Sequence, residues 1–386
     1  MILEQIGQDT LYLISCALHN RTPDEKKVFK MDLERLYGFT KWHTVDSITY
    51  IALSATPDLP QNEVLRRWRE SYFKAIRKSA LMDTQRRKLF SYMDENNIWY
   101  MPLKGIVLRE LYPKQSMRQM ADNDILFDAA FKEDIKNYFI SQGYDVITDV
   151  NKNHDVYEKA PIYNYEMHTS LFGATPDNAW KQYFGDVKTR LIKNETGAGY
   201  HFTDEDFYVY FIAHAFHHYE ESGTGIRSFA DCYVYRSVKE LDDAYIEKEL
   251  QKLGIADFEK LLRSVSDKIF EDIAVEDALA SLSTEEYELL CESISSGTYG
   301  TDKNEITKKL RKVQGGKKPI AVRTKLLYYV RRVFPNMEFY QEYYPFVFRW
   351  KILIPFVVIY RVFRGIILHG KQLWKETVMV WRIGEE

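Results

Sequence analysis

The stretch RQMADNDILFD, residues 118–128, contains two aspartates, Asp122 and Asp124, one residue apart at the start of an apolar run. Alternate side chains of a strand lie on the same face, so the two carboxylates point the same way, with Asn123 opposite, while ILF continues into the core. Two carboxylates this close raise each other's pKa unless a cation keeps both of them ionised. The stretch therefore predicts a buried strand with a cation site at its mouth.

Mg²⁺ is the natural cation for such a site. It prefers oxygen ligands in an octahedron and is usually bound by one or two carboxylates together with substrate phosphates. Two such ions about 3.5–4 Å apart can clamp the attacking and leaving oxygens of a phosphoryl-group displacement. A D-x-D motif alone also occurs in solvated turns and at strand edges, so the residues around it decide between these interpretations.

The residues on both sides of this strand alternate between strand and helix patterns. Before it, IWYMPLKG is a short buried strand that stops at Gly105, and IVLRELYP is a helical pattern closed by Pro113. After it, AFKEDIKNYFISQGYD is an amphipathic helix that ends at Gly143, followed by the strand-like DVIT and a hairpin with its turn near residues 159–161. The middle of the chain is therefore predicted to form a mixed sheet with helices.

Both flanks of this region have helical patterns. Residues 62–97 are charged and lack Gly and Pro, and their apolar residues recur three or four positions apart. TDEDFYVYFIAHAFHHYEE begins with Thr203 as N-cap and with acids in its first turn, and GTG ends this helix. Linkers are expected at SSGTYGTDKNE and QGGKKP. We predict an α+β fold with an N-terminal helical region (1–85), a sheet-containing core (86–195), a helical domain (196–300) and a basic, aromatic helical region (301–386).

The charge is spread unevenly along the chain. The net charge is −3, but the residues from Thr301 to the end contain 18 Lys/Arg against 7 Asp/Glu, a balance of +11, and the residues before them balance to −14. A basic terminal region favours an anionic partner, such as nucleic acid, nucleotide or a membrane surface. A helical subdomain with a solvated basic face and no anionic partner would have the same charge balance.

The cysteines and the apolar segments indicate in which compartment of the cell the chain is found. Cys16, Cys232 and Cys291 lie far apart without C-x-x-C spacing, which argues against a disulfide framework or a zinc site and fits a reducing compartment, the cytoplasm. Acidic residues precede the apolar stretch at the N-terminus, so it does not fit a signal peptide. The most apolar segment, 352–360, is far shorter than the roughly 20 residues of a spanning helix. We expect no transmembrane helix.

An ordered set of residues leads up to the two aspartates: Leu103, Lys104, Gly105, Leu108, Tyr112, Arg118, Asp122 and Asp124. This set resembles the pattern LKG…L…Y…R…D-x-D of the uncharacterised nucleotidyltransferase family of bacteria, a branch of the polymerase-β-like nucleotidyltransferase superfamily. YEMHTSLF is similar to that family's E-h-H strand, and HAFHHYEESGTGIRSFADCY is similar to its H-x₃-H…D helices. The resemblance covers about residues 90–240.

The resemblance implies a small mixed-sheet nucleotidyltransferase core in which Asp122 and Asp124 bind Mg²⁺ or Mn²⁺. The superfamily usually adds a third carboxylate on a neighbouring strand, as metal ligand or as base. Glu166 fits this role, because alternation places Asn164, Glu166 and His168 on one face of their strand; His168 is expected to contact the nucleotide. An edge strand with a solvated polar face has the same pattern. The implied reaction transfers a nucleoside monophosphate from an NTP, such as ATP, to an unidentified acceptor hydroxyl.

The turn expected to hold the phosphates departs from the superfamily, which usually has Gly-Ser or Gly-Gly at this helix start. Here the turn begins with Lys104 and Gly105 and has no hydroxyl. Gly105 allows close backbone approach, and Lys104 supplies a positive charge to phosphate unless it is only an exposed lysine. Arg118 is expected to contact a phosphate or to form an ion pair with Asp122 or Asp128. The missing hydroxyl keeps a second hypothesis open, a non-catalytic binding or scaffold module of this fold.

His214 and His218 are four residues apart and lie on one face of a predicted helix. This spacing can bind zinc, but a third ligand is not apparent nearby, and no glutamate follows the first histidine as in H-E-x-x-H. The resemblance implies instead that His214, His218 and Asp231 form a helical wall over the nucleotide, where they contact base, ribose or each other. Histidines that only pack between helices show the same spacing.

The C-terminal region mixes aromatic and cationic residues. After Pro355, a helical apolar stripe is formed by Phe356, Ile359, Tyr360, Phe363 and Ile367. Arg361 and Arg364 lie off this stripe. The pattern fits a helix packed on a core, a helix at a membrane surface, or stacking platforms for single-stranded nucleic acid.

Overall fold

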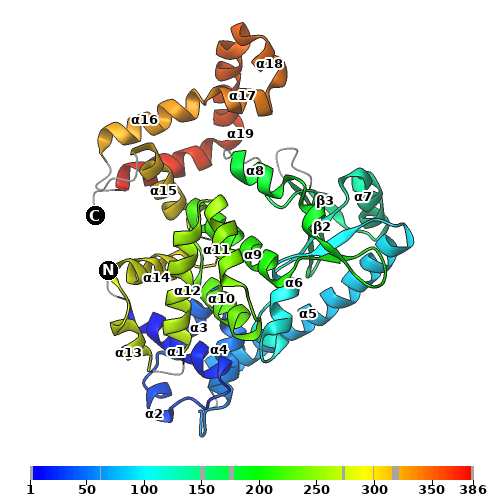
Figure 1. Ribbon diagram of the computed structural model, residues 1–386. Coiled ribbons are helices and arrows are strands. Elements are labelled where there is room, and N and C mark those ends of the chain that lie inside the picture. Colours follow the sequence, from blue (N-terminus) through cyan, green and yellow to red (C-terminus); the bar gives the residue numbers. More distant parts are fainter. Residues whose placement is uncertain are drawn as a thin grey trace. The chain divides into compact units, whose positions relative to one another are not determined.

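The computed structural model describes residues 3–60, 62–147, 153–173, 178–271, 274–298, 300–314 and 321–383. The chain forms two compact units (Figure 1). The N-terminal unit contains residues Met1–Phe216 and Gly225–Thr298, and the C-terminal unit contains His217–Thr224 and Tyr299–Glu386. The fold is α+β as predicted, because helices surround one small mixed sheet. The predicted break at QGGKKP lies outside the described residues.

The N-terminal unit begins with helices: α1 (Gln5–Leu18), α2 (Glu25–Val28), α3 (Leu33–Trp42), α4 (Asp46–Ser54) and α5 (Glu63–Glu95). The long helix α5 begins where Asn62 accepts a hydrogen bond from the backbone N–H of Leu65, and Asn96 is its C-cap residue. Its lack of Gly and Pro lets it run for 33 residues. The C-terminal part of this helix, from Met82 to Met93, packs in the same core as the sheet (Figure 1).

The sheet has five strands in the order β1-β2-β5-β4-β3. Their bounds are β1 (Tyr100–Pro102), β2 (Asn123–Phe127), β3 (Asp145–Ile147), β4 (His154–Lys159) and β5 (Tyr163–His168). Strands β2 and β5 run parallel, and the other neighbours are antiparallel. The strand of the aspartate stretch quoted above, β2, therefore lies between β1 and the central strand β5, which carries Glu166.

One face of the sheet packs on α5 and on α7 (Lys132–Ser141). The ring of Phe139 stacks on Tyr157 at 4.1 Å, and Tyr165 and Met167 of β5 join the same core. Because side chains alternate along a strand, Glu166 and His168 lie on the opposite face. The sheet thus has one aromatic, buried face and one face that carries polar groups.

Short helices connect the strands, and a helical bundle follows them. The connecting elements are α6 (Gly105–Leu108), η1 (Arg109–Leu111), η2 (Gln115–Met117), η3 (Ala129–Phe131), α8 (Asn178–Gly185), η4 (Val187–Arg190), β6 (Ile192–Lys193) and β7 (Tyr200–His201). The bundle contains α9 (Asp204–Glu221), α10 (Ile226–Val238), α11 (Asp243–Lys252), α12 (Ala256–Phe270), α13 (Val275–Ala280) and α14 (Thr284–Ser296). Thr203 caps α9 as predicted, since its hydroxyl accepts a hydrogen bond from the N–H of Asp206 at 3.1 Å.

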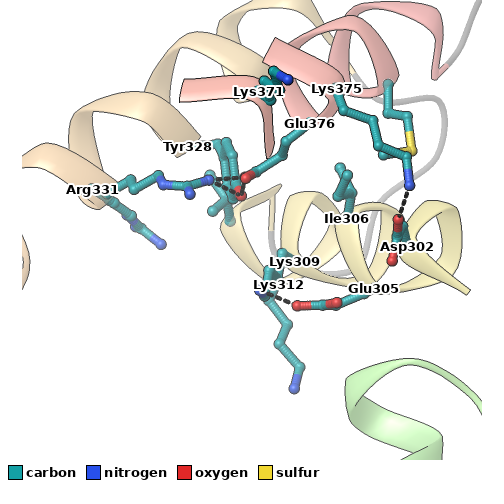
Figure 2. A pocket seen from close by; sticks show the side chains of 13 residues that line it. Asp302, Glu305, Ile306, Lys309, Lys312, Tyr328, Arg331, Lys371, Lys375 and Glu376 are labelled. Atoms are coloured by element: carbon teal, nitrogen blue, oxygen red, sulfur yellow. Dashed lines mark hydrogen bonds and ion pairs between the residues drawn. The ribbon is translucent and has the colours of Figure 1, made fainter. Parts of the chain in front are cut away.

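The C-terminal unit contains α15 (Asp302–Gln314), α16 (Val322–Val333), α17 (Met337–Tyr343), α18 (Pro345–Arg349), η5 (Lys351–Leu353) and α19 (Ile354–Arg382). Its cores are small: one gathers around Leu310 and Val380, the other around Tyr340 and Val358. Helices α15, α16 and α19 line a cavity of about 970 Å³ (Figure 2). In the described part of the chain, no single helix is long and apolar enough to cross a membrane; the segments Lys351–Leu368 and Leu373–Arg382, which meet at 97°, pass that test only as a pair.

Candidate functional site

Three carboxylates gather on the polar side of the sheet. Asp124 of β2 is in register with Glu166 of the parallel strand β5, and Asp122 lies one residue before β2 begins. Asp124 is buried, whereas Asp122 and Glu166 are partly exposed. The structure therefore brings together two residues of the D-x-D motif and a third acid that is more than forty residues away in the sequence.

Two basic side chains contact Asp124. Lys104 Nζ donates a hydrogen bond to Asp124 Oδ1 at 2.8 Å, and His168 Nε2 donates to the same oxygen at 3.0 Å. His168 Nε2 also lies 3.6 Å from Glu166 Oε2. Burial would lower the pKa of His168, but its hydrogen bonds with these two carboxylates raise the pKa above its ordinary value.

The two aspartates of the motif have opposite pKa shifts. Burial alone would raise the pKa of Asp124, but the Lys104 ammonium and the hydrogen bond from His168 hold it well below its usual range. Burial, followed by repulsion from Asp124 and Glu166, raises the pKa of Asp122 to about 7. Lys104 and His168 thus keep Asp124 ionised, whereas burial and the neighbouring carboxylates outweigh the effect of the cations near Asp122.

Lys104 reaches Asp124 from an unusual backbone conformation. It is the N-cap residue of α6, with φ 43° and ψ −111°, in the positive-φ half of the Ramachandran plot where non-glycine residues are uncommon. Only a fifth of its side chain is exposed. Burial would lower the pKa of Lys104, but the Asp124 carboxylate raises it. Lys104 is therefore a charged component of this cluster and not an exposed strand-end lysine.

Arg118 and Asp231 form a buried pair beside this cluster. Arg118 Nε donates to Asp231 Oδ1 at 2.7 Å, and Nη2 donates to Oδ2 at 3.0 Å. The Tyr112 hydroxyl donates to Asp231 Oδ1 at 2.8 Å. The expected ion pair of Arg118 thus exists, but its partner is Asp231 of α10 and not Asp122 or Asp128. The predicted phosphate contact of Arg118 stays a prediction.

Gly105 makes room for the same arginine. A Cβ atom at residue 105 would lie 2.6 Å from Arg118 Nη1 and 3.2 Å from Met120 Sδ. Since Nε and Nη2 of Arg118 are engaged by Asp231, its Nη1 is the group presented to the turn at Lys104 and Gly105. Gly105 thus allows a close approach to the backbone, and the group that approaches it in the described structure is the Arg118 guanidinium.

Further cations surround Asp122, and the sequence patterns did not single them out. Arg227 on α10 lowers the pKa of Asp122, and Asp122 in turn raises the pKa of Lys78, although burial dominates and lowers it. Lys78 Nζ, on α5, donates to the backbone carbonyl of Ala121 at 2.7 Å. Arg227 could have been suspected from its position just after the GTG break, where α10 begins.

His154 is another residue that the sequence patterns missed. Its ring nitrogen lies 3.9 Å from Glu166 Oε2, and ligand atoms of His154, Glu166 and His168 lie within 4.8 Å of one another. The register pairs His154 with His168 across the β4–β5 hairpin. Counting outward from the predicted turn near residues 159–161 would have found this pair. Among the described residues, this trio is a group whose atoms could hold a metal ion.

The helix α9 contributes Tyr210 to the site. Its hydroxyl is buried and has no hydrogen-bond partner among the residues that the structure describes. Burial raises the pKa of Tyr210, and the charges of Lys104 and Asp124 act on it. His214 follows one turn later, with its ring 6.2 Å from that of Tyr210. His218 lies nearer the end of α9, in a segment that belongs to the C-terminal unit.

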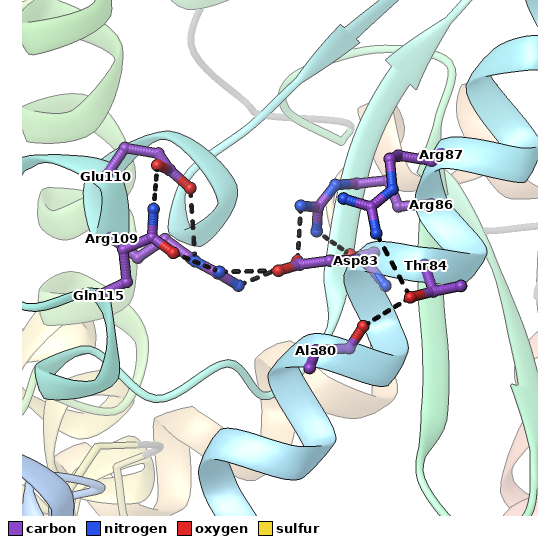
Figure 3. A network of polar contacts seen from close by, with 9 residues as sticks. Ala80, Asp83, Thr84, Arg86, Arg87, Arg109, Glu110 and Gln115 are labelled. Atoms are coloured by element: carbon purple, nitrogen blue, oxygen red, sulfur yellow. Dashed lines mark hydrogen bonds and ion pairs between the residues drawn. The ribbon is translucent and has the colours of Figure 1, made fainter.

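A polar network behind β2 holds the strand in place (Figure 3). Asp83 of α5 accepts hydrogen bonds from Arg109 Nη1 and Nη2 at 3.0 and 2.8 Å, and from Arg86 Nη2 at 2.7 Å. Arg86 Nη1 also donates to Asn123 Oδ1 at 2.8 Å. Asn123 therefore points to α5, and its anchoring turns the neighbouring Asp124 to the polar side of the sheet.

The three carboxylates have the chemistry that a divalent cation prefers, whereas the described group with ligand atoms within 4.8 Å of one another is His154, Glu166 and His168. Asp122, Asp124 and Glu166 offer carboxylate oxygens, the ligands that Mg²⁺ and Mn²⁺ prefer. The raised pKa of Asp122 and the unpartnered hydroxyl of Tyr210 are both consistent with a cluster built for a charged ligand. Such an ion would compete with Lys104 for Asp124 Oδ1.

Comparison with known proteins supplies one match. The family model described as uncharacterised nucleotidyltransferase matches residues 30–271. That range contains every residue of the cluster described above, from Lys78 to Asp231. No curated protein and no solved structure matches the chain.

Proposed function

The chain belongs to the uncharacterised nucleotidyltransferase family, and from this premise we propose that it transfers a nucleoside monophosphate from an NTP to an acceptor hydroxyl. The observation that carries the proposal is the register of Asp124 with Glu166 on two parallel strands, with Asp122 beside them. This arrangement gathers three carboxylates at one point of a rigid sheet. A binding role alone would not need three carboxylates so close together.

In this proposal, Asp122, Asp124 and Glu166 hold Mg²⁺ or Mn²⁺. When bound, the ion supplies positive charge to the phosphate oxygens and to the departing pyrophosphate. The chain's own part is to hold the three carboxylates at the sheet and to keep Asp124 ionised, which Lys104 and His168 already do.

The acceptor oxygen forms a bond to the α-phosphorus, the bond from that phosphorus to the bridging oxygen breaks, and pyrophosphate leaves. The hydroxyl proton goes to a carboxylate of the site. Glu166 is our choice, since its side chain is 25% exposed and that of Asp124 only 6%, so Glu166 is the more accessible to an incoming acceptor.

The cations around the carboxylates suit a triphosphate. Lys104 and the Nη1 group of Arg118 lie at the turn that precedes α6, and Arg227 and Lys78 lie near Asp122. Phosphate oxygens accept charge-assisted hydrogen bonds from such groups, which are stronger than neutral ones. Asp231 acts through Arg118 as a positioning residue. His214, one turn beyond Tyr210, stays our candidate for a contact with base or ribose, and His218 stays a weaker one.

The proposal is tested with NTP radiolabelled at the α-phosphate, Mg²⁺ and fractionated cell extract as the source of acceptor. We expect label transfer and pyrophosphate release. The double variant Asp122→Asn/Asp124→Asn should lose both, together with metal-dependent nucleotide binding. Asp128→Asn is the matched control, because it makes the same change at the far end of the same strand and retains the capping of Ala130. A double variant that binds nucleotide and metal like the parent protein would disprove the site.

A second function is a non-catalytic binding or scaffold module. The observation that favours it is the Lys104–Asp124 hydrogen bond, which neutralises the central carboxylate without a metal, at a turn that has no hydroxyl. Pyrophosphate release with any natural acceptor rules this function out. For either function we propose a cytoplasmic location, since Cys16, Cys232 and Cys291 are buried and lie far apart in the sequence.

A further inference from the structure

The first part of α19 exposes an apolar stripe, which we define as Phe356, Ile359, Tyr360, Phe363 and Ile367. The exposed fractions of these side chains run from 55% to 77%. The spacing also fits a helix packed on a core, but that interpretation is wrong for this stripe. α19 buries a different side, where Val358 packs with Tyr340 and Val347. Soluble monomers rarely expose continuous apolar patches of this kind without an interaction to explain them.

Cations without acidic partners in the described structure precede, interrupt and follow the stripe in the sequence. Among the described residues, Arg349, Lys351, Arg364 and Lys371 are exposed, and none of them forms an ion pair. Lys371 also lines the cavity of Figure 2, together with Arg331, which has no ion-pair partner in the described structure either. Unpaired cations beside an exposed apolar face attract a partner that is negatively charged and apolar at the same time.

The composition of the rest of the C-terminal unit also favours a partner that is negatively charged and apolar. Residues 321–383 contain eleven Lys/Arg and three Glu. A second helix, α16, exposes Val322, Leu326 and Val330 at four-residue spacing, each by more than half of its surface. In contrast, Arg361 of α19 lies over the ring of Phe339 at 4.4 Å from its centre and serves the unit's own packing.

We propose that the C-terminal unit docks on the surface of an anionic phospholipid bilayer. The apolar stripe of α19 lies at the boundary between headgroups and acyl chains, and the bordering cations contact lipid phosphates. An amphipathic helix with a cationic flank binds in this way through its buried apolar area plus electrostatic attraction to anionic lipids. Each Lys or Arg near such a surface adds to this attraction. The proposal does not depend on nucleotidyl transfer.

Two other occupants fit the surface less well. A second copy of the chain in a two-fold dimer would place this surface against itself, so that the unpaired cations of both copies would face each other. Single-stranded nucleic acid stacks its bases on aromatic faces, and the stripe has three of them, but its most exposed side chain is the aliphatic Ile367, at 77%. Aliphatic side chains cannot stack on bases as aromatic rings do.

The test is co-sedimentation of the full chain with vesicles of phosphatidylcholine alone and of phosphatidylcholine mixed with phosphatidylserine. At low salt we expect the chain to pellet with the mixed vesicles and to bind the neutral ones at least about tenfold more weakly. Phe363→Glu/Ile367→Glu should lower the partition coefficient by at least about tenfold. Arg364→Glu/Lys371→Glu should remove the preference for phosphatidylserine.

The matched control is Phe73→Glu/Ile140→Glu. These side chains are exposed to 53% and 52%, and they lie on α5 and α7 of the N-terminal unit. The control should bind vesicles like the parent protein, and circular dichroism should show that every variant is folded.

Four results would overturn the proposal. The first is no vesicle binding at low salt, and the second is binding that Phe363→Glu/Ile367→Glu leaves unchanged. The third is binding that resists an alkaline carbonate wash, which indicates inserted helices. The fourth is a dimer of the parent protein in analytical ultracentrifugation that Phe363→Glu/Ile367→Glu abolishes, while neither the parent protein nor the variant binds vesicles. Tighter binding to a single-stranded oligonucleotide than to mixed vesicles, lost in the same variant, would assign the surface to nucleic acid instead.

Discussion

Lys104 donates a hydrogen bond of 2.8 Å from its Nζ to Oδ1 of Asp124, the central carboxylate of the cluster. The ammonium thus lies where a metal ion would compete with it. Its charge stabilises the ionised form of Asp124 in a buried position, which burial alone would not allow. Lys104 also lies at the turn that is proposed to bind the phosphates. One side chain therefore connects the carboxylate cluster with the proposed phosphate site.

Replacing Lys104 tests this double role. Lys104→Met removes the positive charge that competes for Asp124, so Mg²⁺ should bind more tightly, by about tenfold. The rate of nucleotidyl transfer should nevertheless fall by about a hundredfold or more, because a charge on the phosphates is lost. Calorimetric titration with Mg²⁺ and the transfer assay measure the two effects. Lys136→Met, at an exposed lysine of α7, should change neither, and an unchanged Lys104→Met would mean that the lysine has no part in the site.

Gly105 should be sensitive to a single methyl group. In Gly105→Ala the new Cβ would lie 2.6 Å from Arg118 Nη1. The guanidinium cannot withdraw freely because Asp231 holds it, so the free energy of unfolding should fall by about 1–3 kcal/mol. The measurement is urea denaturation.

Gly38→Ala is the control for this change. Gly38 lies inside α3 with nothing within 4 Å of an added Cβ, so alanine should stabilise the chain by about 0.5–1 kcal/mol. If both substitutions changed the free energy of unfolding by the same amount, helix propensity alone would explain them, and the contact of the new Cβ with Arg118 would have no effect.

The Arg118–Asp231 pair should be important for stability. Asp231→Ala leaves a guanidinium buried without its partner and should lower the free energy of unfolding by about 3–5 kcal/mol. Tyr112→Phe removes one hydrogen bond to the same carboxylate and should cost about 0.5–1.5 kcal/mol. Glu276→Ala breaks an exposed ion pair with Lys27 and should leave the denaturation midpoint nearly unchanged. If Asp231→Ala only raises KM for the NTP and leaves stability intact, Asp231 contacts the nucleotide and not Arg118.

His43 should make stability depend on pH. Its ring is buried, Nε2 donates to the carbonyl of Ile294 at 3.0 Å, and burial lowers the pKa of His43 to about 4. The unfolded chain, with a histidine pKa near 6.5, binds more protons than the folded chain between these values. The free energy of unfolding should therefore fall as pH drops from about 6.5 to 4, by up to about 1.4 kcal/mol per pH unit from this residue.

His43→Gln provides the comparison for this pH dependence. The glutamine amide keeps an N–H donor for Ile294 but does not titrate, so the difference between parent and variant should shrink as pH falls through the window. Urea denaturation at several pH values measures it. Two curves that run parallel from pH 6.5 to 4 would contradict the assignment.

The sequence by itself determined the elements and the faces of the candidate site. Period-two alternation is a local property, so it was sufficient to put Glu166 and His168 on the side of β5 away from Tyr165. The long helix α5, the cap at Thr203 and the break after α9 were likewise predictable, because capping residues, glycine and apolar spacing act over a few positions. The ordered residues before Asp124 were sufficient to indicate the family.

Only the tertiary structure decided which groups meet. Arg118 pairs with Asp231, 113 positions away, and His168 of β5 meets Asp124 of β2, because these contacts depend on how the chain crosses the sheet. The exposure of Phe363 shows the same limit, since apolar spacing reveals that a helix has two faces but not what covers them. Burial is a property of the surroundings of a residue, and local sequence cannot contain it.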